Sequence, residues 1–196
     1  VVEVDLSAIR PMIALPMHPS NAFTIEELNA NLEDILHACE QDVQKLIGRK
    51  DVSLDLCSKI ENGKLRVDQG VIAGCAGGLY DSIYEAASIL KGHTGGCGDY
   101  ALSVYPGSQP IMMELVRTGV IHDLMASGAT VRTAFCGPCF GAGDVPANGA
   151  LSIRHTTRNF PSREGSKPGN GQLSGVALMD ARSIAAVSYT HLTLPT

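Results

Sequence analysis

Three cysteines have the type and spacing of ligands for one metal centre. Cys136 and Cys139 flank a glycine and a proline in the sequence Cys-Gly-Pro-Cys, and Cys75 lies in an earlier glycine-rich segment. The two-residue spacer lets both sulfurs of the pair face one metal centre, and the glycine and proline fix a turn with backbone N–H groups directed toward sulfur. The three thiolates can meet only if the fold brings Cys75 to the pair.

Three other interpretations of these thiols stay open at this point. Cys75 and the pair can be buried thiols without chemistry. The sequence Cys-Gly-Pro-Cys is also the thioredoxin active-site tetrapeptide, which suggests thiol–disulfide exchange by Cys136 and Cys139. That chemistry needs a helix after the first cysteine, and the glycines and Pro146 that follow the pair cannot propagate one. A structural zinc site with Cys97 as fourth ligand is the remaining alternative.

The cysteines lie in a region that alternates between strand and helix patterns. This alternation predicts an α/β domain, a three-layer α/β/α fold with a mainly parallel sheet and right-handed crossovers. Ligands of such sheets gather at the carboxyl ends of the strands, so the glycine-rich loops with Cys75 and the pair are expected at one edge. The predicted strands cover 71–73, 101–105, 129–135 and 151–155, and the predicted helices cover 80–90, 109–125 and 171–186.

A further helix is predicted before this region. Thr24-Ile25-Glu26-Glu27 has the form of a capping box, and apolar residues follow at helical spacing until the stop signal Gly48. The predicted helix, residues 24–47, carries Cys39 on its apolar stripe, where we interpret it as a small buried hydrophobic residue. Cys57 and Cys97 are interpreted as incidental.

The composition argues against two classes of binding partner and indicates the cellular compartment. The chain has 196 residues and a formal net charge of −5, so it carries no basic footprint for nucleic acid or anionic membranes. The sequence contains no run of about 18 apolar residues and no secretory signal at its start. We therefore predict a cytoplasmic protein, in which reduced thiols indicate metal binding, redox chemistry or packing rather than disulfides.

Two arginines lie downstream of the last predicted strand. Arg158 and Arg163 flank a turn that contains Pro161. Both guanidinium groups can reach one anion as bidentate forks. Taken alone, however, the two residues are interpreted as ordinary surface arginines.

Three motifs together resemble the signatures of the aconitase family of hydro-lyases. They are Gly74-Cys75, the segment Ala-Phe-Cys-Gly-Pro-Cys-Phe-Gly at 134–141 and the segment Thr-Arg-Asn-Phe-Pro-Ser-Arg at 157–163. The motifs occur in the family's order, and the similarity runs from about residue 4 to 186. The chain resembles the type formed by aconitase and the large subunit of 3-isopropylmalate dehydratase, and especially bacterial aconitase-like hydratases.

The resemblance implies a cofactor, a substrate class and a reaction. A 4Fe-4S cluster would be held by Cys75, Cys136 and Cys139, with one iron left open to act as a Lewis acid. Arg158 and Arg163 would then bind the carboxylates of a small di- or tricarboxylic acid, to which water is reversibly added. This context reverses the interpretation of the two arginines.

The chain also departs from the family pattern. Ala76 and Gly77 stand where the family usually has Thr-Asn, and Thr157 stands where it usually has Asn, so aconitate itself is in doubt as the substrate. The family's catalytic base and acids lie in other domains, so no catalytic residue is expected in this chain. We expect a fragment, inactive alone, in which residues 1–187 form one domain that works with the enzyme's remaining domains, and 188–196 form an atypical tail of truncated or foreign sequence.

Overall fold

A mixed sheet forms the centre of the molecule. The computed structural model describes residues 1–95 and 100–191, so the alternative zinc ligand Cys97 lies outside the described residues. The strands of the sheet are β1 (Met12–Ala14), β2 (Ala22–Thr24), β5 (Gln69–Ile72), β6 (Ala101–Val104), β7 (Thr130–Val131), β8 (Leu151–His155) and β9 (Gly175–Leu178). Their order is β2-β1-β9-β8-β5-β6-β7. The strands from β5 to β9 pair in parallel, and β1 is antiparallel to both β2 and β9.

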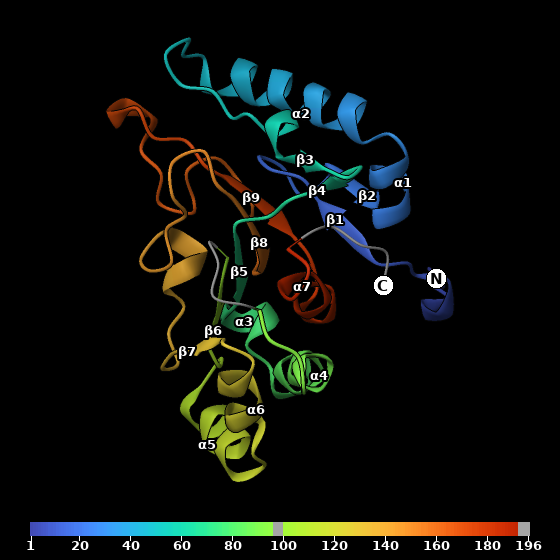
Figure 1. The fold of residues 1–196 in the computed structure, drawn as a ribbon, viewed down its shortest axis with the longest axis vertical. Coiled ribbons are helices and arrows are strands. Elements are labelled where there is room, and N and C mark those ends of the chain that lie inside the picture. The colour runs from blue at the N-terminus through green and yellow to red at the C-terminus, as the bar shows by residue number, and fades with distance from the viewer. Residues whose placement is uncertain (96–99, 192–196) are drawn as a thin grey trace.

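Helices flank this sheet, which confirms the predicted α/β/α architecture. They are α1 (Ile25–Ala30), α2 (Leu32–Ile47), α3 (Gly74–Gly77), α4 (Tyr80–Leu90), α5 (Gln109–Arg117), α6 (Val120–Ala126) and α7 (Ala181–Ser188). The pair α1 and α2 lies at the β1–β2 end, and α5 and α6 lie at the β7 end (Figure 1). Helix α7 packs on α4, β5 and β8. Within 1–95 and 100–191, no helix combines the length and apolarity needed to cross a membrane.

Short elements complete the chain and join the sheet to the N-terminal part. They are the 3-10 helices η1 (Leu6–Ala8), η2 (Cys57–Lys59), η3 (Gly137–Phe140) and η4 (Pro168–Asn170), and the hairpin β3 (Ile60–Glu61) with β4 (Lys64–Leu65).

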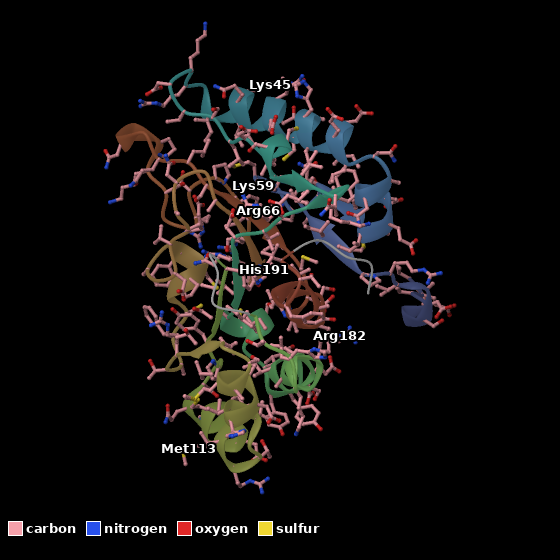
Figure 2. All side chains as sticks on the ribbon, viewed as in Figure 1. Lys45, Lys59, Arg66, Met113, Arg182 and His191 are labelled. Atoms are coloured by element: carbon pink, nitrogen blue, oxygen red, sulfur yellow. The ribbon has the colours of Figure 1, made fainter. Side chains whose placement is uncertain are left out.

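Lys59 and Arg66 lie side by side (Figure 2), and both pair with Asp68 at 2.7 Å. The Asp68 carboxylate also accepts a 2.7 Å hydrogen bond from Leu151 N. This ion-pair network fixes the start of β5 against β8.

Two predicted helices are each divided into two. The capping box at Thr24 and Glu27 is present and Gly48 ends α2 in the left-handed conformation, but a break at Asn31 separates α1 from α2. The predicted helix 109–125 breaks before Gly119, whose φ of 80° suits glycine. Cys39 is 3% exposed, as its place on the apolar stripe predicts.

The predicted helix over 171–186 is wrong in its first part. Residues 175–178 instead form β9, which pairs with β8 over four residues. Helix α7 begins only after Asp180, whose carboxylate accepts hydrogen bonds from Arg182 N and Ser183 N. The predicted strand 129–135 is also shortened to Thr130–Val131. The predicted domain boundary at residue 187 stays a prediction.

Candidate functional site

Cys75 lies three residues after the end of β5, the middle one of the five parallel strands. Ala73 ends the extended segment, and Gly74 turns the chain into α3 with a φ of 73°, a left-handed conformation that favours glycine. Gly78 N donates to Gly74 O at 2.9 Å, which closes the short helical turn. The Cys75 side chain is left exposed at the carboxyl end of the strand.

Cys136 and Cys139 lie on a tight turn, which we call the cysteine-pair loop (residues 136–143). Cys139 N donates to Cys136 O at 3.2 Å, and Ala142 N donates to Gly137 O at 2.9 Å. Cys136 is exposed, whereas Cys139 is only 8% exposed. The turn η3 is a four-residue 3-10 helix that ends at Gly141. No long helix begins at this pair, so the geometry does not favour thioredoxin-like chemistry.

The fold brings the three thiols together at one edge of the sheet. A Cβ atom placed on Gly74 would lie 2.8 Å from Cys139 Sγ and 3.5 Å from Cys136 Sγ. The pKa of Cys139 is raised to about 11, mainly by burial, and then by a hydrogen bond with the Cys136 thiol and by the charges of Cys136 and Cys75. The three sulfurs thus share one microenvironment. Their role as metal ligands stays a prediction.

The thiols should differ in their reactivity toward iodoacetamide. Only the thiolate reacts, and Cys139 has both a raised pKa and a buried sulfur, whereas Cys136 is exposed. In the metal-free chain, we expect Cys136 to be alkylated about tenfold or more faster than Cys139 at pH 8. Timed alkylation with peptide mass spectrometry measures both rates.

Cys39 serves as the internal control for this experiment. Burial, with the charges of Asp42 and Glu40, raises its pKa to about 12, so it should react only after unfolding in urea. Equal rates for Cys136 and Cys139 in the folded chain would contradict the observed geometry of the cysteine-pair loop.

The loop that contains Arg158 and Arg163, here called the arginine loop (residues 156–165), packs against the cysteine-pair loop. A Cβ atom on Gly141 would lie 2.7 Å from Gly165 Cα, which shows how closely the two backbones approach. The Thr157 backbone also forms a hydrogen bond with the Cys139 sulfur, which partly offsets the rise in its pKa. The predicted arginine motif therefore lies beside the predicted cysteine motif.

The two arginines of this loop differ in their environment. Arg158 is exposed, and Arg163 is half-buried. The Nε atom of Arg163 is buried without a hydrogen-bond partner among the described residues. A buried donor without an acceptor is costly, so a ligand that accepts this hydrogen bond would be favoured here. The role of Arg158 and Arg163 in binding substrate carboxylates stays a prediction.

Asn159 anchors the arginine loop to the N-terminal hairpin. Its side chain is 2% exposed, and Nδ2 donates to Leu15 O at 2.6 Å and to Ala14 O at 3.3 Å. In return, Asn159 O accepts a 3.0 Å hydrogen bond from Met17 N. The sequence motif contains this asparagine, but its long-range partners cannot be found from the motif.

Arg154 is a site residue to which the sequence analysis gives no role. It is 1% exposed, and its Nη1 atom donates to Pro138 O at 2.7 Å while Nη2 donates to Asp144 O at 2.6 Å. Both carbonyls belong to the segment that begins with the cysteine pair. The only signal in the sequence is an arginine within a buried strand pattern.

The departure at position 77 has a steric reason. A Cβ atom on Gly77 would lie 2.3 Å from His155 O and 2.9 Å from His155 Cβ, so the asparagine of the family pattern does not fit here without movement of β8. Burial lowers the pKa of His155, and its Nδ1 atom has no hydrogen-bond partner among the described residues. The histidine thus lies against α3 as a neutral group.

Comparison with known proteins matches the chain to a family over nearly its whole length. The model of the aconitase family (aconitate hydratase) matches residues 1–186. The large subunit of 3-isopropylmalate dehydratase from Thermoanaerobacter sp. (strain X514) is 31% identical over 189 residues, which cover 94% of this chain and 36% of that protein. The same subunit from Clostridium botulinum (strain Alaska E43 / Type E3) is 30% identical over 185 residues, with the same coverage.

The match covers only part of each relative. The large subunit from Caldanaerobacter subterraneus subsp. tengcongensis (strain DSM 15242 / JCM 11007 / NBRC 100824 / MB4) is also 31% identical, again over 94% of this chain and 36% of the relative. The chain therefore spans about a third of the length of the curated relatives it matches. The family match, the parallel sheet and the order of the three motifs along the chain lead to one assignment. The chain belongs to the aconitase family.

Proposed function

We propose that this chain holds a 4Fe-4S cluster, on Cys75, Cys136 and Cys139, for an aconitase-like hydro-lyase. The observation that carries the proposal is the convergence of three thiols from two loops beside Gly74. Thiolate sulfur is the standard protein ligand of iron–sulfur clusters, and three thiolates leave one iron of a four-iron cluster without a protein ligand. The donor set therefore fits the group that the family implies.

The exposure of the thiols agrees with this proposal. Cys75 and Cys136 are exposed and Cys139 lies behind them, so a group bound by all three would face the outside of the domain. When bound, the cluster supplies a Lewis acid that polarises a C–O bond of the substrate. Arg158 and Arg163 would hold the carboxylates of a small di- or tricarboxylic acid as bidentate forks. The unpartnered Nε atom of Arg163 supports this assignment.

The acid and base groups of the reaction would come from outside this chain. The relatives are named as large subunits, so a partner subunit or further domains of the same enzyme complete the site. The reaction is then the reversible addition and removal of water, and this chain alone has no turnover. The proposal places the enzyme in the cytoplasm, where its thiols stay reduced.

Anaerobic reconstitution tests the cluster proposal. Incubation of the chain with ferric iron, sulfide and a thiol reductant that supplies the electrons for the ferrous ions should load about four iron and four sulfide ions per chain and produce a broad visible absorption. The control is the chain in which Cys75, Cys136 and Cys139 are all replaced by serine, here called the triple-serine chain. Iron and sulfide analysis measures the result. Equal loading of both chains, or no loading of the unaltered one, would overturn the proposal.

A further inference from the structure

We propose that His37, Glu40 and Cys57 form a second metal site, for one divalent ion of the Zn²⁺ class. One nitrogen, one carboxylate oxygen and one sulfur of these side chains lie within 4.8 Å of one another. Nitrogen, oxygen and sulfur ligands together suit zinc, which binds three protein groups and a water in open tetrahedral sites. The site lies on α2 and η2, and none of its residues belongs to the two loops described above.

Glu40 is held in place before any ion binds. Its Oε1 atom accepts hydrogen bonds from Leu56 N at 2.6 Å and from Cys57 N at 2.7 Å. The other oxygen, Oε2, lies 3.8 Å from His37 Nδ1, and the Glu40 side chain is 19% exposed. The carboxylate therefore has one oxygen committed to the backbone of η2 and one oxygen available to an ion.

His37 lies one helical turn before Glu40, so the two side chains share one face of α2. Its other ring nitrogen, Nε2, lies 2.9 Å from the side-chain amide of Gln41. The Gln41 atom at this distance is its amide nitrogen. Rotation of the amide by half a turn brings its oxygen there, so that Nε2–H donates to it and the lone pair of Nδ1 is left for the ion. Metal-binding histidines usually have such an outer partner.

Cys57 provides the sulfur from η2. Its Sγ atom lies 4.0 Å from the backbone oxygen of Glu33 on α2. The negative charges of Glu40, Asp55 and Glu33 all act on the thiol. These negative charges favour a cation. Binding forms a metal–sulfur bond and releases the thiol proton to solvent. The exposed His37, with 65% of its side chain accessible, leaves room for a water ligand.

Cobalt provides the test, because Co²⁺ occupies zinc sites and reports its ligands by its spectrum. Titration of the triple-serine chain avoids the three thiols proposed to hold the cluster. We expect a single Co²⁺ per chain, with a thiolate-to-cobalt charge-transfer band in the near ultraviolet. Cys57→Ser should abolish this band, and His37→Gln and Glu40→Gln should each weaken the Kd by about tenfold or more. Zn²⁺ should displace the cobalt.

Cys39→Ser is the matched control, because it removes a thiol of α2 that is not part of the site and should leave the band unchanged. Glu40→Gln retains an oxygen that can accept the two backbone hydrogen bonds, and His37 is exposed, so neither change should unfold the chain; circular dichroism checks this. Absence of cobalt binding, or a band that survives Cys57→Ser, would overturn the site. Either outcome leaves the cluster proposal untouched, since the triple-serine chain lacks those ligands.

Discussion

Replacement of Arg154 with methionine is expected to lower the free energy of unfolding by about 3 kcal/mol and to prevent cluster loading. The guanidinium group makes four hydrogen bonds: to Pro138 O and Asp144 O, to Ser152 Oγ at 3.0 Å and to Gln69 Oε1 at 3.2 Å. Methionine has similar length but no donor. The substitution therefore removes the Arg154 donor from a buried carbonyl at Pro138 and from a part-buried one at Asp144.

The position of these two carbonyls explains why Arg154→Met should also prevent cluster loading. Pro138 immediately precedes Cys139, and Asp144 immediately follows the cysteine-pair loop, so Arg154 attaches this loop at both ends to β8. Burial lowers the pKa of Arg154 to about 10, which leaves the guanidinium protonated at pH 7. Its positive charge also lies close enough to interact with the Cys139 sulfur. Loss of Arg154 thus removes both the anchor of the loop and a charge that favours bound thiolates.

Two further variants separate these contributions. Arg182→Met is the matched control. Arg182 is an exposed arginine whose ion-pair partners among residues 1–95 and 100–191 are the carboxylates of Glu85 and Asp180, so its loss should change stability by about 0.5 kcal/mol or less. Arg154→Lys keeps the charge but loses the planar fork, so it should fall between the unaltered chain and Arg154→Met. Urea unfolding and iron analysis after reconstitution measure both quantities. Unchanged stability and full iron loading in Arg154→Met would contradict the anchoring role.

The sequence was sufficient to predict the edge of the sheet at which the thiols meet. Strand β5 and the loop after β7 are both followed by glycine-rich cysteine segments, and the rule for parallel strands places such loops at one edge. Local signals also located the start of α1, since Thr24 and Glu27 form the expected capping box. These features depend on residues that are neighbours in the chain, so they can be predicted from the sequence alone.

The features that sequence analysis missed depend on residues far apart in the chain. The segment 175–178 has apolar residues that fit a helix or a strand equally well, and only pairing with β8 makes it β9. Arg154 reaches two carbonyls in another loop, and Cys57 meets His37 and Glu40 only because η2 folds back on α2. The spacing of residues along the chain does not indicate such long-range contacts.

Gly74→Ala is expected to reduce iron loading to the level of the triple-serine chain. The new methyl group would lie 2.8 Å from Cys139 Sγ, a separation that requires the sulfur or the loop to move. Cys139 cannot easily give way, because its sulfur is buried and the backbone on its N-terminal side is held by Arg154. Displacement of this sulfur, together with that of Cys136 at 3.5 Å, would remove the common position of the three ligands.

Gly119→Ala is the control that separates the effect of backbone strain from the effect of contact with the cysteine sulfurs. Gly119 has a φ of 80°, close to the 73° of Gly74, and a Cβ atom there meets nothing within 4 Å. Both substitutions should therefore cost about 1–2 kcal/mol of stability for the left-handed conformation, while only Gly74→Ala loses iron. Equal iron loading in the two variants would show that the space beside Gly74 is not needed by the cluster. A loss confined to Gly74→Ala would instead tie cluster binding to the sulfurs that this glycine accommodates.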